Sequence, residues 1–152
     1  MHNEEERREW LHVLSHAAPA DLEESWRQLA APHAFDTLRH AQSGLAMIRG
    51  RADGSGRPFN MGEATISRCV VTTTDTRTGG EIMGVGYVLG RDKRHAELTA
   101  HFDAVFQDTD TGAAARERVL PPLRAKRADA LERTARKTDG TRVDFFTMVR
   151  GE

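Results

Sequence analysis

A single cysteine, Cys69, is present in the whole sequence of 152 residues, and this scarcity excludes several kinds of site. One thiol cannot form an internal disulfide, a four-thiolate zinc site or a self-contained iron–sulfur cluster. We therefore expect no metal site built from thiolates on this chain. Any iron–sulfur centre would have to lie on another chain.

Long hydrophobic runs are also missing. No uncharged segment approaches the roughly 20 residues that a membrane-spanning helix needs. The N-terminus is acidic at Glu4, Glu5 and Glu6, where a signal peptide would be basic and then apolar. The sequence predicts a cytoplasmic protein that has no membrane partner.

An excess of charge of one sign is absent as well. The 22 Lys and Arg residues balance 23 Asp and Glu residues, so the net charge of -1 predicts no overall attraction to nucleic acid. The length suits one domain over residues 1–152. With 38% hydrophobic and 30% charged residues, the chain is polar for a self-sufficient globule, and this balance fits a subunit of an assembly.

The first part of the chain has apolar residues at helical spacing. The pattern predicts one helix over residues 3–16 and a second helix that Asp21 caps and that stops by Pro32. Together they form a helical hairpin. A third short helix is predicted over residues 34–42, which would direct Phe35 and Leu38 inward.

After Gly44 the pattern becomes typical of strands. We predict strands at residues 45–48, 65–74 and 82–89, with a glycine-bearing loop over 50–62 and a hairpin turn over 75–80. In the third strand Met83, Val85, Tyr87 and Leu89 share one face. Gly84 and Gly86 share the other face, where we expect a helix to cross close to the backbone.

The last third of the chain predicts further helices and a final strand. Asp92 is the expected cap of a helix that ends near Asp108, and the pair Pro121–Pro122 is expected to break the next helix. Residues 142–150 have apolar side chains on both faces of a predicted strand. The fold class is α+β, with an antiparallel sheet of about four strands, the N-terminal helical hairpin, and helices between the third and last strands.

Two groups of residues invite an enzymatic interpretation. His12 and His16 are four residues apart on a predicted helix, a spacing that can bind zinc, but no third ligand is evident and a solvated helix face is the stronger interpretation. Cys69 lies in the middle of a predicted strand with no adjacent base, which favours a small core residue over a nucleophile. We assign no catalytic residue and no metal ligand.

Basic residues collect at two places that could meet a phosphate or an acidic partner. Arg49, Arg51 and Arg57 lie in and beside the glycine-bearing loop. The second group is at the start of the helix after the third strand, where Arg91, Lys93, Arg94 and His95 oppose the helix dipole. An anion or a carboxylate, including one on another subunit, would offset that charge. The candidate ligand or interface contacts are Arg49, Arg51, Arg57, Arg91, Lys93, His95, Arg142 and Arg150.

The stretch over residues 113–142 is also basic. It could form a nucleic-acid face, but it has no interleaved aromatic residues and no recognised DNA-binding pattern. A solvated or partner-facing helix is the better interpretation.

Four blocks of the sequence together resemble the G subunit of the bacterial carbon–phosphorus lyase system. They are GLAMIRGR (44–51), PFNMGEAT (58–65), GRDKRHAE (90–97) and VDFFTMVRG (143–151). Their order and spacing match along nearly the whole chain, and the last block is the most specific of the four.

The resemblance implies a small accessory subunit of a core complex with subunits H, I and J. With subunits H, I and L, such a subunit supports a transferase reaction in which an alkylphosphonate displaces adenine from ATP. The product is a ribose 1-alkylphosphonate 5-triphosphate. The resemblance also implies that ATP, with Mg²⁺, is a substrate of the complex, that an iron–sulfur cluster belongs to subunit J, and that subunit I carries the nucleosidase-like chemistry.

Three hypotheses follow. The first is a non-catalytic subunit of this phosphonate-catabolic complex, inactive as an isolated chain, with no nucleic-acid partner. The second is an independent enzyme that uses a metal at His12 and His16 or a nucleophile at Cys69. The third is a nucleic-acid-binding module that uses the basic stretch.

Overall fold

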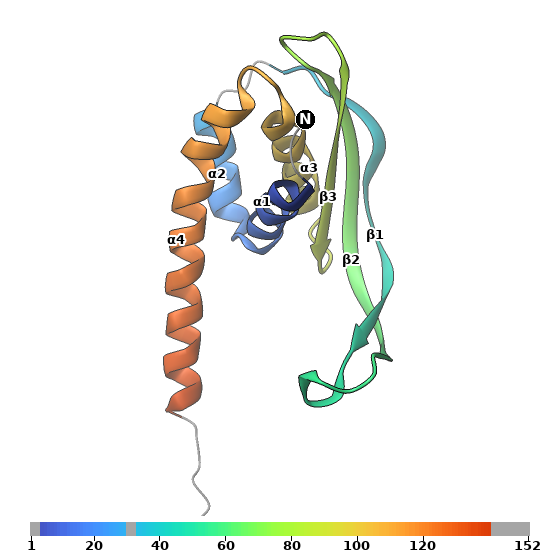
Figure 1. Cartoon of the computed structure of the whole chain (residues 1–152), viewed down its shortest axis with the longest axis vertical. Helices are drawn as coiled ribbons and strands as arrows, with labels where there is room; N and C mark the ends of the chain where they lie inside the picture. Colours follow the sequence, from blue (N-terminus) through green and yellow to red (C-terminus); the bar gives the residue numbers. More distant parts are fainter. Residues whose placement is uncertain (1–3, 30–32, 141–152) are drawn as a thin grey trace, which may run out of the picture.

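The computed structural model describes residues 4–29 and 33–140. In chain order the elements are α1 (Glu4–His16), α2 (Pro19–Leu29), β1 (Asp36–Gly50), the 3-10 turn η1 (Ala52–Gly54), β2 (Phe59–Thr74), β3 (Glu81–Leu89), α3 (Lys93–Gln107) and α4 (Gly112–Asp139) (Figure 1). The predicted α+β class, the N-terminal helical hairpin and the helices after the third strand are confirmed. The fourth predicted strand, residues 142–150, lies outside the described residues.

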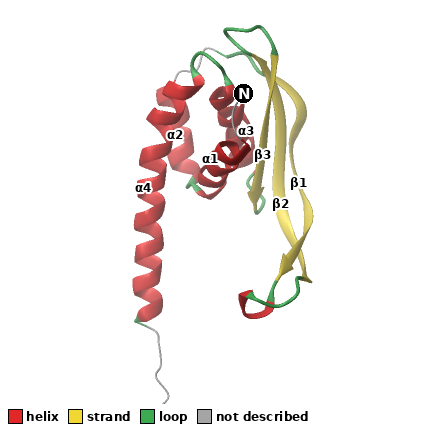
Figure 2. Cartoon of the chain, viewed as in Figure 1, coloured by secondary structure: helices red, strands yellow, loops and turns green. Residues whose placement is uncertain are grey.

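The three strands form one antiparallel sheet in the order β1-β2-β3. Figure 2 shows the helices on one side of this sheet, and α3 is the helix that packs directly against it. The helices α1, α2 and α4 pack around α3. We call the face under α3 the inner face and the opposite face the outer face. Within the described part of the chain, no helix covers the outer face.

Small residues let α3 approach the sheet. A Cβ atom added at Gly84 would overlap the Ala100 carbonyl oxygen, and one at Gly86 would overlap the Ala96 carbonyl oxygen. Ala96 and Ala100 are themselves fully buried. The predicted close crossing of the glycine face by a helix is therefore confirmed, and it fixes which face of the sheet belongs to the core.

A buried carboxylate ties the helical layer to the sheet. Asp103 of α3 accepts hydrogen bonds from Arg7 Nη2 at 2.7 Å and from Trp10 Nε1 at 2.9 Å. It also accepts one from the Val85 backbone N–H at 2.9 Å. Because these donors come from α1 and β3, one side chain joins three elements. A buried acid with such partners avoids the cost of an unpaired charge.

The prediction of a third short helix over residues 34–42 is wrong. Those residues form the start of β1, which pairs with β2 from Asp36 opposite Thr72 onward. Long-range pairing outweighs the local helical spacing here. Phe35 still points inward, with its ring centroid 4.5 Å from that of His101, whereas Leu38 is 59% exposed. The strands are also longer than predicted, so the connection between β1 and β2 is shorter than residues 50–62.

The prolines do not break the last helix, contrary to the prediction. The helix α4 is continuous over 28 residues and contains Pro121 and Pro122, which are both exposed. Their neighbours Leu120 and Leu123 are buried against the helical layer. The packing of these leucines outweighs the local preference, and backbone carbonyls that lose a donor on the solvent side can bond water. The helix α2 similarly begins at Pro19, two residues before the predicted cap Asp21.

Length and hydropathy together rule out a bilayer-spanning role for every helix in the described ranges.

Candidate functional site

The first candidate surface is a two-stranded ribbon that extends beyond the three-stranded part of the sheet. The strand β3 pairs with β2 only from Ile66 to Thr74, so the part of β2 before Ile66 has β1 as its only strand partner in the described chain. Figure 1 shows this ribbon, residues 44–65, projecting past α1, α2 and α3. Its large apolar side chains are exposed to between 41% and 66%: Leu45, Met47, Ile48, Phe59 and Met61. Exposed apolar residues gathered in this way are typical of an interaction surface.

The predicted arginines of the loop lie at the far end of this ribbon. Arg49, Arg51 and Arg57 are all exposed. Arg51 Nη1 donates a long hydrogen bond of 3.4 Å to the Gly56 carbonyl oxygen. Among the described residues no carboxylate forms an ion pair with these three side chains.

The second candidate surface is the outer face of the sheet. Strand register places Val85 opposite Val70, Tyr87 opposite Arg68, and Leu89 opposite Ile66. Tyr87 is 53% exposed and Leu89 is 74% exposed. On the next strand Gln42 pairs with Arg68. The predicted division of β3 into two faces is confirmed, and its apolar face is the one that no helix of the described residues covers.

The predicted basic cluster at the start of α3 is divided between two environments. Asp92 caps the helix as predicted, and its side chain accepts from the His95 N–H at 2.9 Å. Arg94 bonds Glu23 of α2 at 2.7 Å and Glu97 at 2.8 Å. The hydrogen bond to Glu23 is the main reason that the pKa of Arg94 is raised. The charge of Arg94 is therefore offset within this chain, by Glu97 and by the unforeseen Glu23. Arg91 and Lys93 are exposed and pair with no carboxylate of the described residues.

His95 has a structural position. Its side chain is buried, and its Nε2 donates to the Leu14 carbonyl oxygen at 2.9 Å. This bond ties α3 to the end of α1, so the His95 side chain has a structural role in the described chain. The ring centroid of His101, farther along α3, lies 5.4 Å from that of Trp26.

The two basic groups do not converge on one point. The Gly90 N–H donates to the Thr65 carbonyl oxygen at 2.8 Å, which places Arg91 and Lys93 near the base of the ribbon. Six residues of extended strand, roughly 20 Å, separate Thr65 from Phe59 at the ribbon's end. Each group can meet a phosphate or carboxylate separately. The predicted contacts Arg142 and Arg150 lie outside the described residues.

The histidine pair lacks the surroundings of a metal site. The rings of His12 and His16 are 4.5 Å apart between centroids, and His16 Nδ1 donates to the His12 carbonyl oxygen at 2.9 Å. Partial desolvation, followed by the charges of Arg127 and His16, lowers the pKa of His12. No group of three or more metal-ligating side chains occurs in residues 4–29 and 33–140.

Cys69 is a core residue. Its side chain is 1% exposed, and its thiol donates to the Arg39 carbonyl oxygen at 3.4 Å. Burial, with a smaller effect from Glu97, raises the pKa of the thiol. A nucleophilic cysteine needs the opposite shift, so the structure favours the core interpretation of the sequence.

The basic side chains of α4 are partly engaged within the chain. Arg124 pairs with Glu9 at 2.6 Å, and Lys126 pairs with Asp21 at 2.6 Å. Arg116 lies over the Trp10 ring, 5.2 Å from its centroid. These contacts attach the first half of α4 to α1 and α2. Figure 1 shows the second half extending past the rest of the helical layer.

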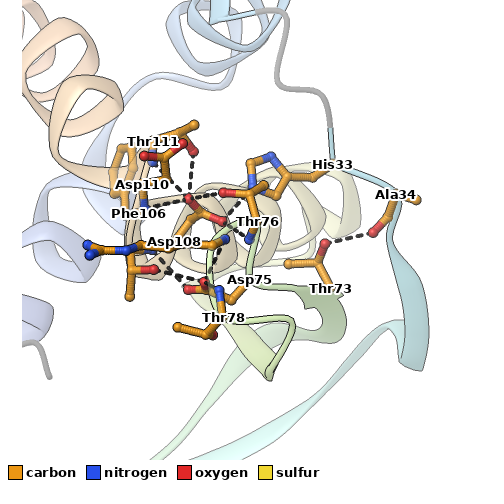
Figure 3. A network of polar contacts seen from close by, with 12 residues as sticks. His33, Ala34, Thr73, Asp75, Thr76, Thr78, Phe106, Asp108, Asp110 and Thr111 are labelled. Carbon is orange, nitrogen blue, oxygen red and sulfur yellow. Dashed lines mark hydrogen bonds and ion pairs between the residues drawn. The ribbon is translucent and has the colours of Figure 1, made fainter.

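Two short turns with the same sequence pattern clasp each other at the end of the sheet. Asp75-Thr76-Arg77-Thr78 follows β2, and Asp108-Thr109-Asp110-Thr111 follows α3. Asp75 accepts from the Thr109 N–H at 2.9 Å, and Asp108 accepts from the Thr76 N–H at 2.8 Å (Figure 3). Each aspartate also caps its own turn, with Thr78 N–H 2.7 Å from Asp75 and Thr111 N–H 2.8 Å from Asp108. Sequence analysis missed this clasp, although the repeated D-T-x-T pattern was a signal for it.

The clasp keeps both carboxylates ionised. Hydrogen bonds, first from Thr78 N–H and then from Thr109, lower the pKa of Asp75. Burial alone would raise the pKa of Asp108, but donors from Thr111 and Thr76 outweigh it and lower the pKa. His33 Nε2 is a further donor to Asp108, at 3.3 Å. With their oxygens saturated by donors, the two acids act as structural acceptors and are poor general acids at neutral pH.

The fold and these surfaces define a class: a small α+β protein with one helical layer on one face of an antiparallel sheet and with apolar side chains exposed on the other face and on the ribbon. The model of the family described as phosphonate metabolism protein PhnG matches residues 5–151. A curated relative from Rhizobium meliloti (strain 1021), named alpha-D-ribose 1-methylphosphonate 5-triphosphate synthase subunit PhnG, is 42% identical over 148 residues. That alignment covers 97% of this chain and 90% of the relative. The chain belongs to the PhnG family, and the resemblance found in the sequence is confirmed.

Proposed function

We propose that the chain is an accessory, non-catalytic subunit of the complex that transfers the ribose 5-triphosphate group of ATP to an alkylphosphonate. Its expected partners are subunits H, I and J of the core complex, and subunit L in the reaction, all in the cytoplasm where ATP is available. The relative's name, which is that of a synthase subunit, supports this role. The observation that carries the proposal is the ribbon, whose apolar side chains are exposed to between 41% and 66% in the single chain.

The reaction needs groups that the described part of this chain does not bring together. Displacement at the anomeric carbon of ribose requires a donor for the departing adenine and a cradle for a cationic centre, besides cations for the triphosphate. The carboxylates that the structure buries, Asp75, Asp103 and Asp108, already accept several hydrogen bonds each. Exposed cations remain at Arg91 and Lys93 and at the end of the ribbon. We therefore assign to this chain the support of a neighbouring catalytic subunit and a contact to phosphate oxygens.

The substrates and metal ions belong to the complex in this proposal. ATP, with Mg²⁺, reaches the complex as substrate, and we assign the iron–sulfur cluster of the later cleavage step to subunit J. We assign no cofactor to this chain.

Reconstitution tests the role. Subunits H, I and L are assayed for adenine release from ATP and methylphosphonate, with and without this chain, and the chain is also assayed alone. We expect no adenine from the isolated chain, a loss of most of the activity without it, and recovery when it is added back. Adenine release by the pure chain alone would show that it is an independent enzyme.

A further inference from the structure

Two arginines share one amide on the outer face of the sheet. With the Gln42 side chain oriented so that its oxygen faces them, that oxygen accepts from Arg39 Nη1 at 2.9 Å and from Arg68 Nε at 3.2 Å. The two guanidinium groups come from neighbouring strands and are held on the same face by strand register. We call Arg39, Gln42 and Arg68 the arginine pair site.

The positive charge of this site is not balanced by a carboxylate of the described residues. The ion pairs of the described residues involve other basic side chains, and neither arginine of the site takes part in one. Like charges held close together on adjacent strands are destabilising. The Gln42 side-chain oxygen aligns the two guanidinium groups, but because the amide is neutral it does not offset their positive charge. The geometry is therefore suited to an incoming oxyanion, which two guanidinium groups bind through several parallel hydrogen bonds.

Apolar side chains surround the site. Tyr87 is directly opposite Arg68 in the register, and Val70 is opposite Arg39. Leu89, at 74% exposure, and Met83, at 48% exposure, extend the apolar surface along β3. A free anion would leave these side chains in water. A protein surface would cover them and would shield the charge pair from solvent, which strengthens it.

We propose that a partner subunit with a central acidic side chain docks on the outer face and places its carboxylate between Arg39 and Arg68. This inference rests on the proposed function and deepens it by assigning the docking surface and the chemistry of the partner. The partner surface is apolar with an acidic side chain at its centre. Arg39 and Arg68 then serve the assembly, while Arg91, Lys93 and the ribbon's end remain available for phosphate oxygens.

The test is co-purification of the tagged full chain with co-expressed subunits H, I and J, followed by titration of the affinity between them. We compare wild type with Arg39→Gln, Arg68→Gln and the double variant. The matched control is Arg77→Gln, an exposed arginine in the turn after β2 whose backbone N–H, but not its side chain, contacts Asp75. Thermal unfolding of each isolated variant shows whether the fold is retained.

We expect the dissociation constant to rise at least about tenfold for Arg68→Gln and to rise further for the double variant. The control should bind as wild type does. High salt should weaken the wild-type complex more than the double variant. A folded double variant that assembles with wild-type affinity would overturn the inference, whereas failure of wild type to co-purify would overturn the proposed function itself.

Two other outcomes would also overturn it. A dimer of the isolated chain that Arg68→Gln dissociates would make a second copy the occupant. Binding of inorganic phosphate to the isolated chain that Arg68→Gln abolishes, with assembly unchanged, would make the arginine pair site a small-anion site.

Discussion

Along β3, the two faces of the sheet carry residues of very different size. On the inner face Gly84 and Gly86 admit the backbone of α3, and nothing larger than hydrogen fits at either position. On the outer face the same strand presents Met83, Tyr87 and Leu89 to solvent. The strand β3 therefore packs against the core on one side and exposes large apolar side chains on the other. A core can be completed by one helix, whereas large apolar side chains that no described helix covers are typical of an interaction surface.

The largest expected loss of stability comes from a substitution on the inner face of the sheet. Gly86→Ala places a methyl group against the Ala96 carbonyl oxygen, so α3 must move away from the sheet. We expect a loss of about 3 kcal/mol or more in the free energy of unfolding, measured by urea denaturation. The matched control is Gly44→Ala, where nothing lies within 4 Å of the added Cβ, and it should change stability by less than about 0.5 kcal/mol. Equal effects of the two changes would show that the close crossing is not required.

A substitution in the clasp at the end of the sheet should lower the stability nearly as much. Asp108→Ala removes the acceptor for the N–H groups of Thr76 and Thr111. Leaving those donors without partners should cost about 3 kcal/mol. Asp110→Ala is the control, because Asp110 is exposed and only its backbone N–H bonds the clasp. If both variants unfold at the same urea concentration, the clasp does not stabilise the fold.

The same carboxylate should give stability a pH dependence. Since folding lowers the pKa of Asp108, its contribution is complete above the unfolded pKa of about 4 and is lost as the pH falls toward the folded pKa. Between about pH 5 and pH 2, wild type should therefore lose stability more steeply than Asp108→Asn. Urea titrations at several pH values measure the two slopes, and parallel curves would contradict the assignment.

Variants at the basic start of α3 distinguish a role in ligand binding from a role in subunit assembly. Arg91→Ala and Lys93→Ala remove exposed cations that have no carboxylate partner in the described chain. If these residues touch phosphate, the KM of the reconstituted complex for ATP or phosphonate should rise about tenfold, the effect of one charged hydrogen bond, while the subunits still assemble. Weakened association with unchanged kinetics would place Arg91 and Lys93 in an interface.

A smaller effect is expected at Cys69. Cys69→Ala removes one buried sulfur atom from the inner face and should cost about 1 kcal/mol in unfolding free energy. The activity of the reconstituted complex should remain at the wild-type level. Loss of activity in a variant that still folds and assembles would restore the hypothesis of a nucleophilic cysteine.

Much of the fold could be predicted from the sequence, because local patterns agree with the tertiary structure. The alternation in β3, the cap at Asp92 and the turn over residues 75–80 are all found in the structure. The errors fall in segments whose structure depends on contacts with residues far away in the sequence. The start of β1 is a strand because β2 lies beside it, and α4 passes through Pro121 and Pro122 because Leu120 and Leu123 are buried on other helices.

The candidate surfaces were harder to predict. The partner of Arg94 is Glu23, 71 residues away, and no local pattern connects them. The arginine pair site likewise depends on strand register across β1 and β2, which includes irregularities on both sides of Arg39. A resemblance to a family supplied the functional hypothesis, but only the folded chain shows which side of the sheet no described helix covers.

The most direct test of the account uses the apolar outer face. The double variant Tyr87→Ser and Leu89→Ser changes two side chains that are 53% and 74% exposed. The isolated variant should unfold within about 0.5 kcal/mol of wild type. In co-expression with subunits H, I and J, native mass spectrometry of the tagged chain should show the assembled complex for wild type and the free chain for the variant. An assembled complex of unchanged mass and yield with the variant would contradict the claim that this face binds a partner subunit.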